Sequence, residues 1–244
     1  MDTPVCELLK AYASIRGPNE ASAAPARRVC RGERIRRSIS EAIRLERGEP
    51  NMNFKDTGFL SREEIQAIGF AAVGENVSID RTARFYGTGR ISIGSQVRID
   101  AYSILSAGTE GISIGNHVHI SVYVFLTGAA RIELNDFSGL AARVTIYSSN
   151  DDYLGEALTG PTIPEELRKV TNAPVIVGRH SVVGAGSVIL PGVTISEGAC
   201  VGALSLIKKD VPPFLIVAGH NGQVVRERRK DFLEYERRLR HEHD

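Results

Sequence analysis

The stretch Val177–Ile207, VGRHSVVGAGSVILPGVTISEGACVGALSLI, carries one branched apolar residue at every sixth position. These residues are Val177, Val183, Ile189, Ile195, Val201 and Ile207, and most of them are followed by a small residue. Self-similarity at such a short, fixed period indicates a repeat architecture, in which each unit buries its apolar side chain only by stacking on its neighbours. The period therefore decides the fold class before any single residue does.

The six-residue period predicts a chain that turns a corner after each short strand. One branched side chain per face points into a narrow core, small residues let the backbone bend, and three faces close a coil of about 18 residues. The same register continues upstream at Val73, Ile79, Ile93, Ile99, Leu105, Ile114, Ile120, Leu126, Leu134, Leu140 and Ile146. Glycine-containing segments at 87–89, 108–111 and 128–130 take up extra residues in these longer coils. The sequence therefore predicts an all-β fold, a parallel β-helix.

The repeat divides the chain into three parts. Residues 71–212 are expected to form the β-helix, with an inserted loop over 147–174 where the register is lost. Residues 1–70 are expected to form an N-terminal extension of loops and helices, with one helix over Glu33–Arg47. Within it, Ser61–Glu64 has the spacing of a capping box and predicts a short helix over Arg62–Ile68.

The third part, residues 213–244, is charged and is expected to end in a helix over Val224–Glu242. One side of this helix is expected to pack on the coils through Phe232, Leu233, Tyr235 and Leu239. Its arginines alternate with Glu227, Asp231, Glu234 and Glu236. Because these carboxylates cancel the positive charge, a solvated face is expected here rather than a nucleic-acid patch.

The composition favours a cytoplasmic protein without nucleic-acid partners or membrane insertion. The 244 residues carry a formal net charge of +1, so no overall field attracts polyanions. The three cysteines, Cys6, Cys30 and Cys200, are widely spaced and odd in number, which suits reduced thiols. The N-terminus has no basic segment followed by an apolar run, and no stretch reaches the roughly 18 apolar residues of a membrane span.

The inserted loop concentrates side chains that form hydrogen bonds. It begins with Ser149-Asn150-Asp151-Asp152-Tyr153, and loops of its length in a compact fold are usually functional or disordered. We expect it to form the wall of an active site. Asp151 and Asp152 are the expected catalytic groups, and Asn150 and Tyr153 are expected to contact the substrate.

Three segments carry a resemblance to a known family: Leu60–Glu64, Ser149–Tyr153 and Ile189–Ile195. With the coils between them, they resemble the hexapeptide-repeat acyltransferases, above all the dTDP-4-amino-4,6-dideoxyglucose acyltransferases and also the maltose and galactoside O-acetyltransferases. The resemblance covers about residues 60–228. It implies a left-handed parallel β-helix, a homotrimer, and acyl transfer from acetyl-CoA, which lies in a groove between neighbouring helices. It implies no metal.

The resemblance also assigns residues to coenzyme A. The matching positions are Gly184, Ala185, Gly202 and Ala203 for backbone contacts to pantetheine, and Lys208, Lys209 and Arg226 for the nucleotide end and its phosphates. Backbone groups at coil corners can hold the pantetheine amides, and small residues let the thioester approach. Gln223 departs from the galactoside enzymes, which carry a second arginine there.

The O-acetyltransferases of this family use a histidine on the inserted loop as general base, because a hydroxyl is almost wholly protonated at neutral pH. The register aligns that histidine with Asp151, and the insertion contains no histidine. A carboxylate with a pKa of about 3.9 is a weak base for an alcohol, whereas a neutral sugar amine is already nucleophilic. We therefore expect N-acylation of a nucleotide-linked deoxyamino sugar for surface polysaccharide, with Asp151 or Asp152 binding the ammonium form and assisting its deprotonation.

Other interpretations of these residues stay open. Asp151 and Asp152 can instead shape a solvent-exposed turn. His117 and His119 are two residues apart and would face the same way on a strand, which makes His119 an alternative base for O-acetylation of a saccharide hydroxyl. A zinc site would need a third ligand, for which only His180 is near another repeat.

Several of these residues can also be interpreted without a role in binding or catalysis. Tyr123, like Tyr153, is a candidate for stacking on the sugar and equally a packing residue. Lys208 and Lys209 can be plain solvated charges. An interpretation from another functional class is a non-catalytic β-helix scaffold, or a metal protein that resembles the γ-carbonic anhydrases. Bound zinc without affinity for coenzyme A would favour that class.

Overall fold

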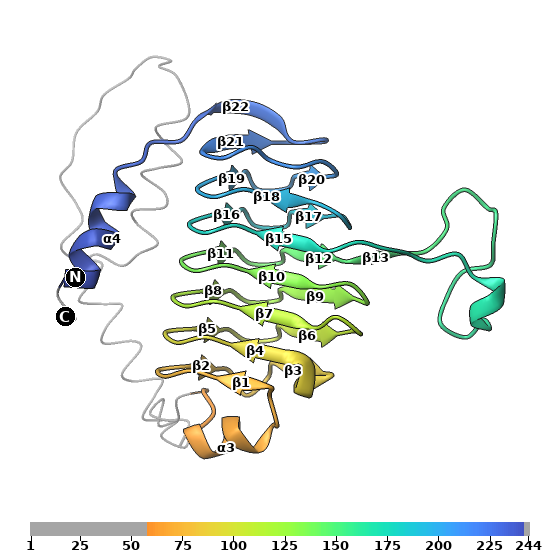
Figure 1. The fold of residues 1–244 in the computed structure, drawn as a ribbon, viewed down its shortest axis with the longest axis horizontal. Helices are drawn as coiled ribbons and strands as arrows, with labels where there is room; N and C mark the ends of the chain where they lie inside the picture. Colours follow the sequence, from red (N-terminus) through yellow and green to blue (C-terminus); the bar gives the residue numbers. More distant parts are fainter. Residues whose placement is uncertain (1–57, 242–244) are drawn as a thin grey trace, which may run out of the picture. The chain divides into compact units, whose positions relative to one another are not determined.

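A computed structural model of the protein describes residues 58–241, within the compact unit Asp56–Asp244. These residues form a parallel β-helix whose coils stack in chain order, so the predicted fold class is confirmed (Figure 1). The helix expected over Glu33–Arg47, and the side chains of Cys6 and Cys30, lie outside the described residues.

Three sheets form the three sides of the coil stack. The first sheet contains β1 (Ala72–Val73), β4 (Ile91–Ile93), β7 (Ile112–Ile114), β10 (Ile132–Leu134), β15 (Val175–Val177) and β18 (Thr194–Ile195). The second contains β2 (Ser78–Ile79), β5 (Arg98–Ile99), β8 (His119–Ile120), β11 (Gly139–Leu140), β16 (Val182–Val183), β19 (Cys200–Val201), β21 (Leu215–Ala218) and β22 (Gln223–Glu227). The third contains β3 (Arg84–Tyr86), β6 (Ile104–Ala107), β9 (Phe125–Gly128), β12 (Thr145–Tyr147), β17 (Val188–Ile189) and β20 (Leu206–Ile207).

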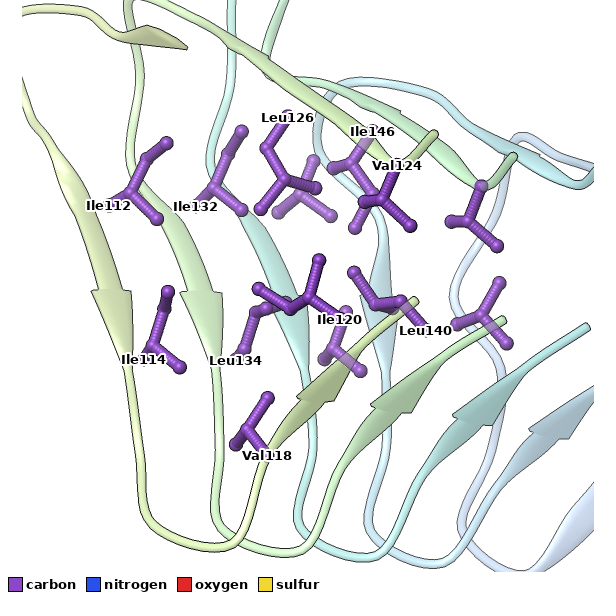
Figure 2. Packing of buried hydrophobic residues seen from close by; sticks show 14 of the residues in the cluster. Ile112, Ile114, Val118, Ile120, Val124, Leu126, Ile132, Leu134, Leu140 and Ile146 are labelled. Atoms are coloured by element: carbon purple, nitrogen blue, oxygen red, sulfur yellow. The ribbon is translucent and has the colours of Figure 1, made fainter. Parts of the chain in front are cut away.

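The apolar residues of the six-residue period form the core. On the second sheet, Ile120 pairs with Leu140, and Leu140 pairs with Val183, so like positions lie directly above one another. All three side chains are at most 1% exposed. Figure 2 shows the side chains of successive coils pointing into the space between the sheets. Burial of each such side chain contributes about 1.5–3 kcal/mol, so the stack is stabilised along its whole length.

The corners between the first and second sheets use the left-handed backbone region once in each coil. The residues concerned include Asn76, Gln96, His117, Phe137 and His180, whose φ angles lie between 54° and 59°. Residues other than glycine rarely adopt this conformation. Hydrogen bonds between coils offset the strain, because the N–H of His117 donates to the Ser95 carbonyl at 2.9 Å and the N–H of Phe137 donates to the Asn116 carbonyl at 2.9 Å.

The N-terminal end of the stack carries the short helix that the capping box predicted. Helix α3 spans Arg62–Ala67, and its N-cap Ser61 accepts a hydrogen bond from the backbone of Glu64, whose carboxylate accepts one from Ser61 in return. The helix buries Ile65 against the first coil. This prediction is confirmed.

The C-terminal segment differs from its prediction in two ways. Val224 and Val225 lie in β22, which pairs antiparallel with β21, so the part of the expected helix before Phe232 is wrong. The edge of the second sheet offers unpaired backbone groups, and β-branched residues favour the strand that satisfies them. Helix α4 spans Phe232–His241. Of the predicted packing residues, Phe232, Leu233 and Leu239 are half-buried, but Tyr235 is 67% exposed and the buried residue of the helix is Glu236, so the predicted face is wrong at Tyr235 alone. No helix within residues 58–241 is long and apolar enough to cross a membrane.

Candidate active site

The inserted loop leaves the stack at the corner between the third and first sheets. It starts after β12 and returns at β15, and its base is a two-stranded antiparallel ribbon of β13 (Ser149–Asn150) and β14 (Thr171–Asn172). A 3₁₀ helix, η2 (Glu165–Leu167), lies in the part beyond the ribbon. Figure 1 shows the ribbon leading away from its own coils.

A hollow of about 350 Å³ lies where the ribbon meets the stack. It is lined by Asn150, Asp151, Asp152, Tyr153, Leu154, Lys169, Thr171, Leu190, Pro191 and Lys208. The fold thus brings together the four polar residues that the sequence singled out in the insertion. It adds Lys208, which the resemblance had assigned to the nucleotide end of coenzyme A.

The two aspartates in this hollow have different surroundings. The carboxylate of Asp152 accepts hydrogen bonds from the backbone N–H groups of Leu154 and Ala157, both at 2.8 Å, and of Glu156. These bonds, the one from Leu154 first, lower the pKa of Asp152. Asp152 therefore shapes the loop. Asp151 is exposed and makes no hydrogen bond or ion pair with any residue in the described part of the chain, so its carboxylate is open to a ligand.

The residues assigned to pantetheine lie on the second sheet and at its corner with the third. The N–H of Gly184 donates to the Val201 carbonyl at 2.8 Å, and that of Gly202 donates to the Val217 carbonyl at 2.7 Å. A Cβ at Gly184 would clash with the backbone of Ala203, so coil stacking alone requires glycine there. The N–H groups of Ala185 and Ala203 have no hydrogen-bond acceptor among residues 58–241 and are free to bind an amide carbonyl.

His119 lies on the outer side of the second sheet, beside two residues that the sequence analysis missed. Its Nε2 lies 2.8 Å from Oδ2 of Asp100, and Nε of Arg98 lies 2.7 Å from Oδ1 of the same carboxylate. Burial acts to raise the pKa of Asp100, but the hydrogen bonds from His119 and Arg98 outweigh it, so that pKa is lowered. Asp100 is therefore an ionised acceptor. The Asp100 and His119 positions, 19 residues apart, meet because the coils stack in register.

His117 does not lie on the strand that contains His119, so the alternative in which both rings face the same way is not met. His117 precedes β8 and has the left-handed backbone conformation of the corner. Its ring stacks on Phe137, with ring centroids 4.6 Å apart. Phe137 in turn stacks on His180 at 5.0 Å and so separates the two histidines that a zinc site would have used. Among the described side chains, no three His, Cys, Asp or Glu residues gather in a group that could hold a metal ion.

The remaining predicted residues occupy different sides of the chain. Tyr123, half exposed at the corner between the second and third sheets, stacks on Tyr102 with centroids 5.1 Å apart. Tyr153 is 84% exposed in the hollow. Arg226 pairs with Ile216 at the C-terminal edge of the second sheet, whereas Lys208 and Lys209 follow β20 of the third. Of the residues expected to bind coenzyme A, a single chain therefore brings Lys208 into the hollow with the expected substrate residues, whereas Gly184, Gly202 and Arg226 lie outside its lining.

Comparisons with known proteins found relatives of this chain among acyltransferases. The chain is 40% identical over 178 residues to a dTDP-4-amino-4,6-dideoxy-D-glucose acyltransferase of Escherichia coli, which covers 73% of this chain and 93% of that protein. A galactoside O-acetyltransferase of Escherichia coli K12 is 38% identical over 74 residues, 29% of this chain and 36% of that protein. No family model matches the sequence.

Solved structures agree with this result. AntD, an N-acyltransferase from Bacillus cereus crystallised with dTDP and 3-hydroxybutyryl-CoA, superposes with a TM-score of 0.72 at 39% identity and covers 75% of this chain and 96% of its own. An AntD variant in complex with dTDP-4-amino-4,6-dideoxyglucose and coenzyme A gives the same TM-score at 40% identity and covers 75% of this chain and 97% of its own.

Proposed function

Because the chain belongs to the dTDP-4-amino-4,6-dideoxyglucose acyltransferases, a group of hexapeptide-repeat enzymes with a left-handed β-helix, we propose that it transfers an acetyl group from acetyl-CoA to the amino group of a nucleotide-linked deoxyamino sugar. The observation that carries the proposal is 40% identity over 93% of the length of the Escherichia coli acyltransferase. Such a sugar is a building block for surface polysaccharide.

The chemistry of the insertion supports an amine as the acceptor. Asp151 offers an open carboxylate, which can bind the ammonium form of the sugar and orient the nitrogen. A neutral amine attacks a thioester without prior ionisation, whereas a hydroxyl needs a strong, positioned base. Asp152 supports the loop that presents Asp151, because its three backbone hydrogen bonds hold the turn that follows.

The second sheet supports a track for the pantetheine arm. Gly184 and Gly202 let successive coils stack closely, and the free N–H groups of Ala185 and Ala203 beside them can bind the two amide carbonyls of the arm. Arg226 lies at the C-terminal end of the same sheet, where it can pair with phosphate. The arm then runs from Arg226 toward earlier coils, so that the thioester lies nearer the N-terminal end.

We infer a homotrimer from the separation of these two sets of residues. The hollow of Asp151 lies at the corner between the third and first sheets, and the pantetheine track lies on the second sheet, with the apolar core between them. The ribbon of β13 and β14 leads away from its own coils (Figure 1). In a closed ring of identical chains, the insertion of one chain reaches the second sheet of its neighbour and completes the site.

The test is a thiol-release assay with acetyl-CoA against nucleotide-linked amino sugars, with product masses measured by mass spectrometry. Amide formation on one of these sugars, and no reaction with the matching neutral saccharides, is the expected result. A parallel series with 3-hydroxybutyryl-CoA, the ligand of AntD, tests the choice of acyl group. Transfer to hydroxyls only, or no binding of coenzyme A, would overturn the proposal.

A further inference from the structure

We propose that His119, held by Asp100, is a catalytic residue that takes the proton from the attacking sugar nitrogen, in a site on the outer side of the second sheet. The inference rests on the proposed function and adds a residue to it. The geometry of three successive coils carries it: the carboxylate that holds the imidazole, the space above the ring, and the line of small residues that leads there.

The first step is the state of the imidazole. Asp100 lies beneath His119 with its side chain 13% exposed, whereas the side chain of His119 is 53% exposed. In the tautomer that fits an ionised Asp100, Nε2–H of His119 donates to Oδ2, and Nδ1 is the ring nitrogen that can accept a proton. Arg98 holds the other carboxylate oxygen at 2.7 Å. An imidazole oriented in this way by a carboxylate is arranged as a general base.

The second step is the room around the ring. Gly139 pairs directly with His119 on the next coil. A Cβ built at Gly139 would have no heavy atom within 4 Å, so the position beside the imidazole is open space. Gly139 lies in β11 without a positive φ, so the backbone does not require glycine there. The charged groups that face His119 are Asp100 and Arg98 from the coil below, and Gly139 brings none from the coil above.

The third step is the line of residues that joins His119 to the pantetheine track. Asp100, Ser121, Ala141, Gly184 and Gly202 follow the buried residue of the second sheet in successive coils, and we call them the second-sheet strip. Each donates its backbone N–H to the next coil; for Ser121 the acceptor is the Leu140 carbonyl at 3.0 Å. Above Asp100 the strip consists of small residues. Coils stack about 4.8 Å apart, so His119 is about 10 Å from the coil of Gly184, on the side to which the thioester end points.

The reaction then balances without another reactant besides water. The ammonium form held by Asp151 first releases one proton to water. The neutral sugar amine then attacks the thioester carbonyl, and a C–N bond forms. Nδ1 of His119 takes the proton that the nitrogen loses, and the C–S bond breaks. The leaving thiolate of coenzyme A receives that proton from the imidazolium, which restores His119. Asp151 of the neighbouring chain, in this arrangement, binds and orients the amine but does not need to act as the base.

The main experiment compares His119→Ala with the wild-type enzyme. We expect kcat to fall about a hundredfold while the KM for acetyl-CoA changes less than about twofold, since the base acts only in the transition state. Added imidazole is expected to restore activity to His119→Ala through the open space beside Gly139. His220→Ala, which removes an exposed histidine elsewhere, is the matched control and is expected to behave as wild type in both measurements.

Two variants of Gly139 fill the open space beside the imidazole and leave His119 itself unchanged. Gly139→Val is expected to raise the KM for the amino sugar or abolish turnover, and Gly139→Ala is expected to have a smaller effect. Because the position is open and lies in a strand, both should keep the thermal midpoint of the wild type within a few degrees.

The outcomes separate this inference from the proposed function. If the wild-type enzyme acylates no amine, the proposed function fails. If it does, and His119→Ala keeps wild-type kcat, then Asp100 and His119 form only a surface ion pair and this inference alone is overturned. Loss of kcat that imidazole does not restore, together with a lowered thermal midpoint, also overturns it, because the role of His119 is then structural.

Discussion

At the scale of single residues, the adjacent aspartates Asp151 and Asp152 have different surroundings. Asp151 and Asp152 both line the hollow, but three backbone N–H groups occupy Asp152, and Asp151 is open. Of the two aspartates in this motif, Asp152 is therefore bonded within the loop and Asp151 is the one that we propose binds the ligand. The conformation of the loop backbone determines which of the two carboxylates accepts the N–H groups.

Replacing Asp151 by Asn tests this division. It removes the charge that binds the ammonium group but keeps the shape, so we expect kcat/KM for the amino sugar to fall at least about tenfold with acetyl-CoA binding unchanged. Steady-state kinetics and calorimetric titration of coenzyme A measure the two effects. Asp152→Asn should instead make residues 153–157 more sensitive to proteolysis. Equal kinetics for Asp151→Asn and wild type would contradict the assignment.

The carboxylate of Asp100 makes stability depend on pH. Its pKa is lower in the folded than in the unfolded chain, so the ionised form stabilises the fold above about pH 4 and this contribution is lost as the pH falls further. We expect the wild type to exceed Asp100→Asn in thermal midpoint near pH 7, with the difference shrinking below about pH 4. Thermal scans across this range measure it, and a difference that does not change with pH would contradict the prediction.

At the scale of elements, each coil depends on the one above and below it. Leu140 lies between Ile120 and Val183 and is 1% exposed. Leu140→Ala leaves a cavity that stacked coils cannot close, and we expect the free energy of unfolding to fall by about 2–5 kcal/mol. Denaturant titration measures it, with Val225→Ala at a 60% exposed position as the control. A loss below about 1 kcal/mol would show that the coils relax around the cavity.

Helix α4 contacts the coils through a buried carboxylate as well as through Phe232, whose ring packs on His180 with centroids 5.0 Å apart. Glu236 bonds His180 and Arg240, both at 2.8 Å, and also Arg179. Removing the carboxylate leaves the buried ring of His180 without its charged partner. We therefore expect Glu236→Gln to increase hydrogen exchange in α4 by at least about tenfold while the coils keep their protection. Unchanged exchange in α4 would mean that Phe232 and its neighbours suffice to hold the helix.

At the scale of the whole molecule, the proposed site needs residues from two chains. If Asp151 of one protomer meets His119 of the next, the single variants Asp151→Asn and His119→Ala should complement each other. Mixed and refolded in equal amounts, they are expected to recover about a quarter of wild-type activity, because random assembly makes one interface in four with both native residues. Activity and light-scattering mass are measured on the same sample. No recovery in a trimeric mixture would place both residues in one chain's site, or exclude one of them.

The sequence by itself determined the coil, the core and the capped helix α3. Each of these follows from a short-range pattern: a branched residue every six positions, and a serine three residues before a glutamate. The same patterns, with the resemblance that Ser149–Tyr153 carries, pointed to the insertion and to Asp151. Local spacing is enough for these features because each involves only a few consecutive residues.

Only the tertiary structure decided which side chains meet. Asp100 and His119 are 19 residues apart, and His180 and Glu236 are 56 apart, and neither pair belongs to a local motif. His117 lies at a corner and not on the strand of His119, because its backbone takes the left-handed conformation of that corner. Val224 lies in β22 and not in the expected helix, because the sheet edge offers backbone hydrogen bonds. Whether two residues on different coils come into contact depends on the number of residues in every corner between them. The contact is therefore decided only when the whole chain has folded.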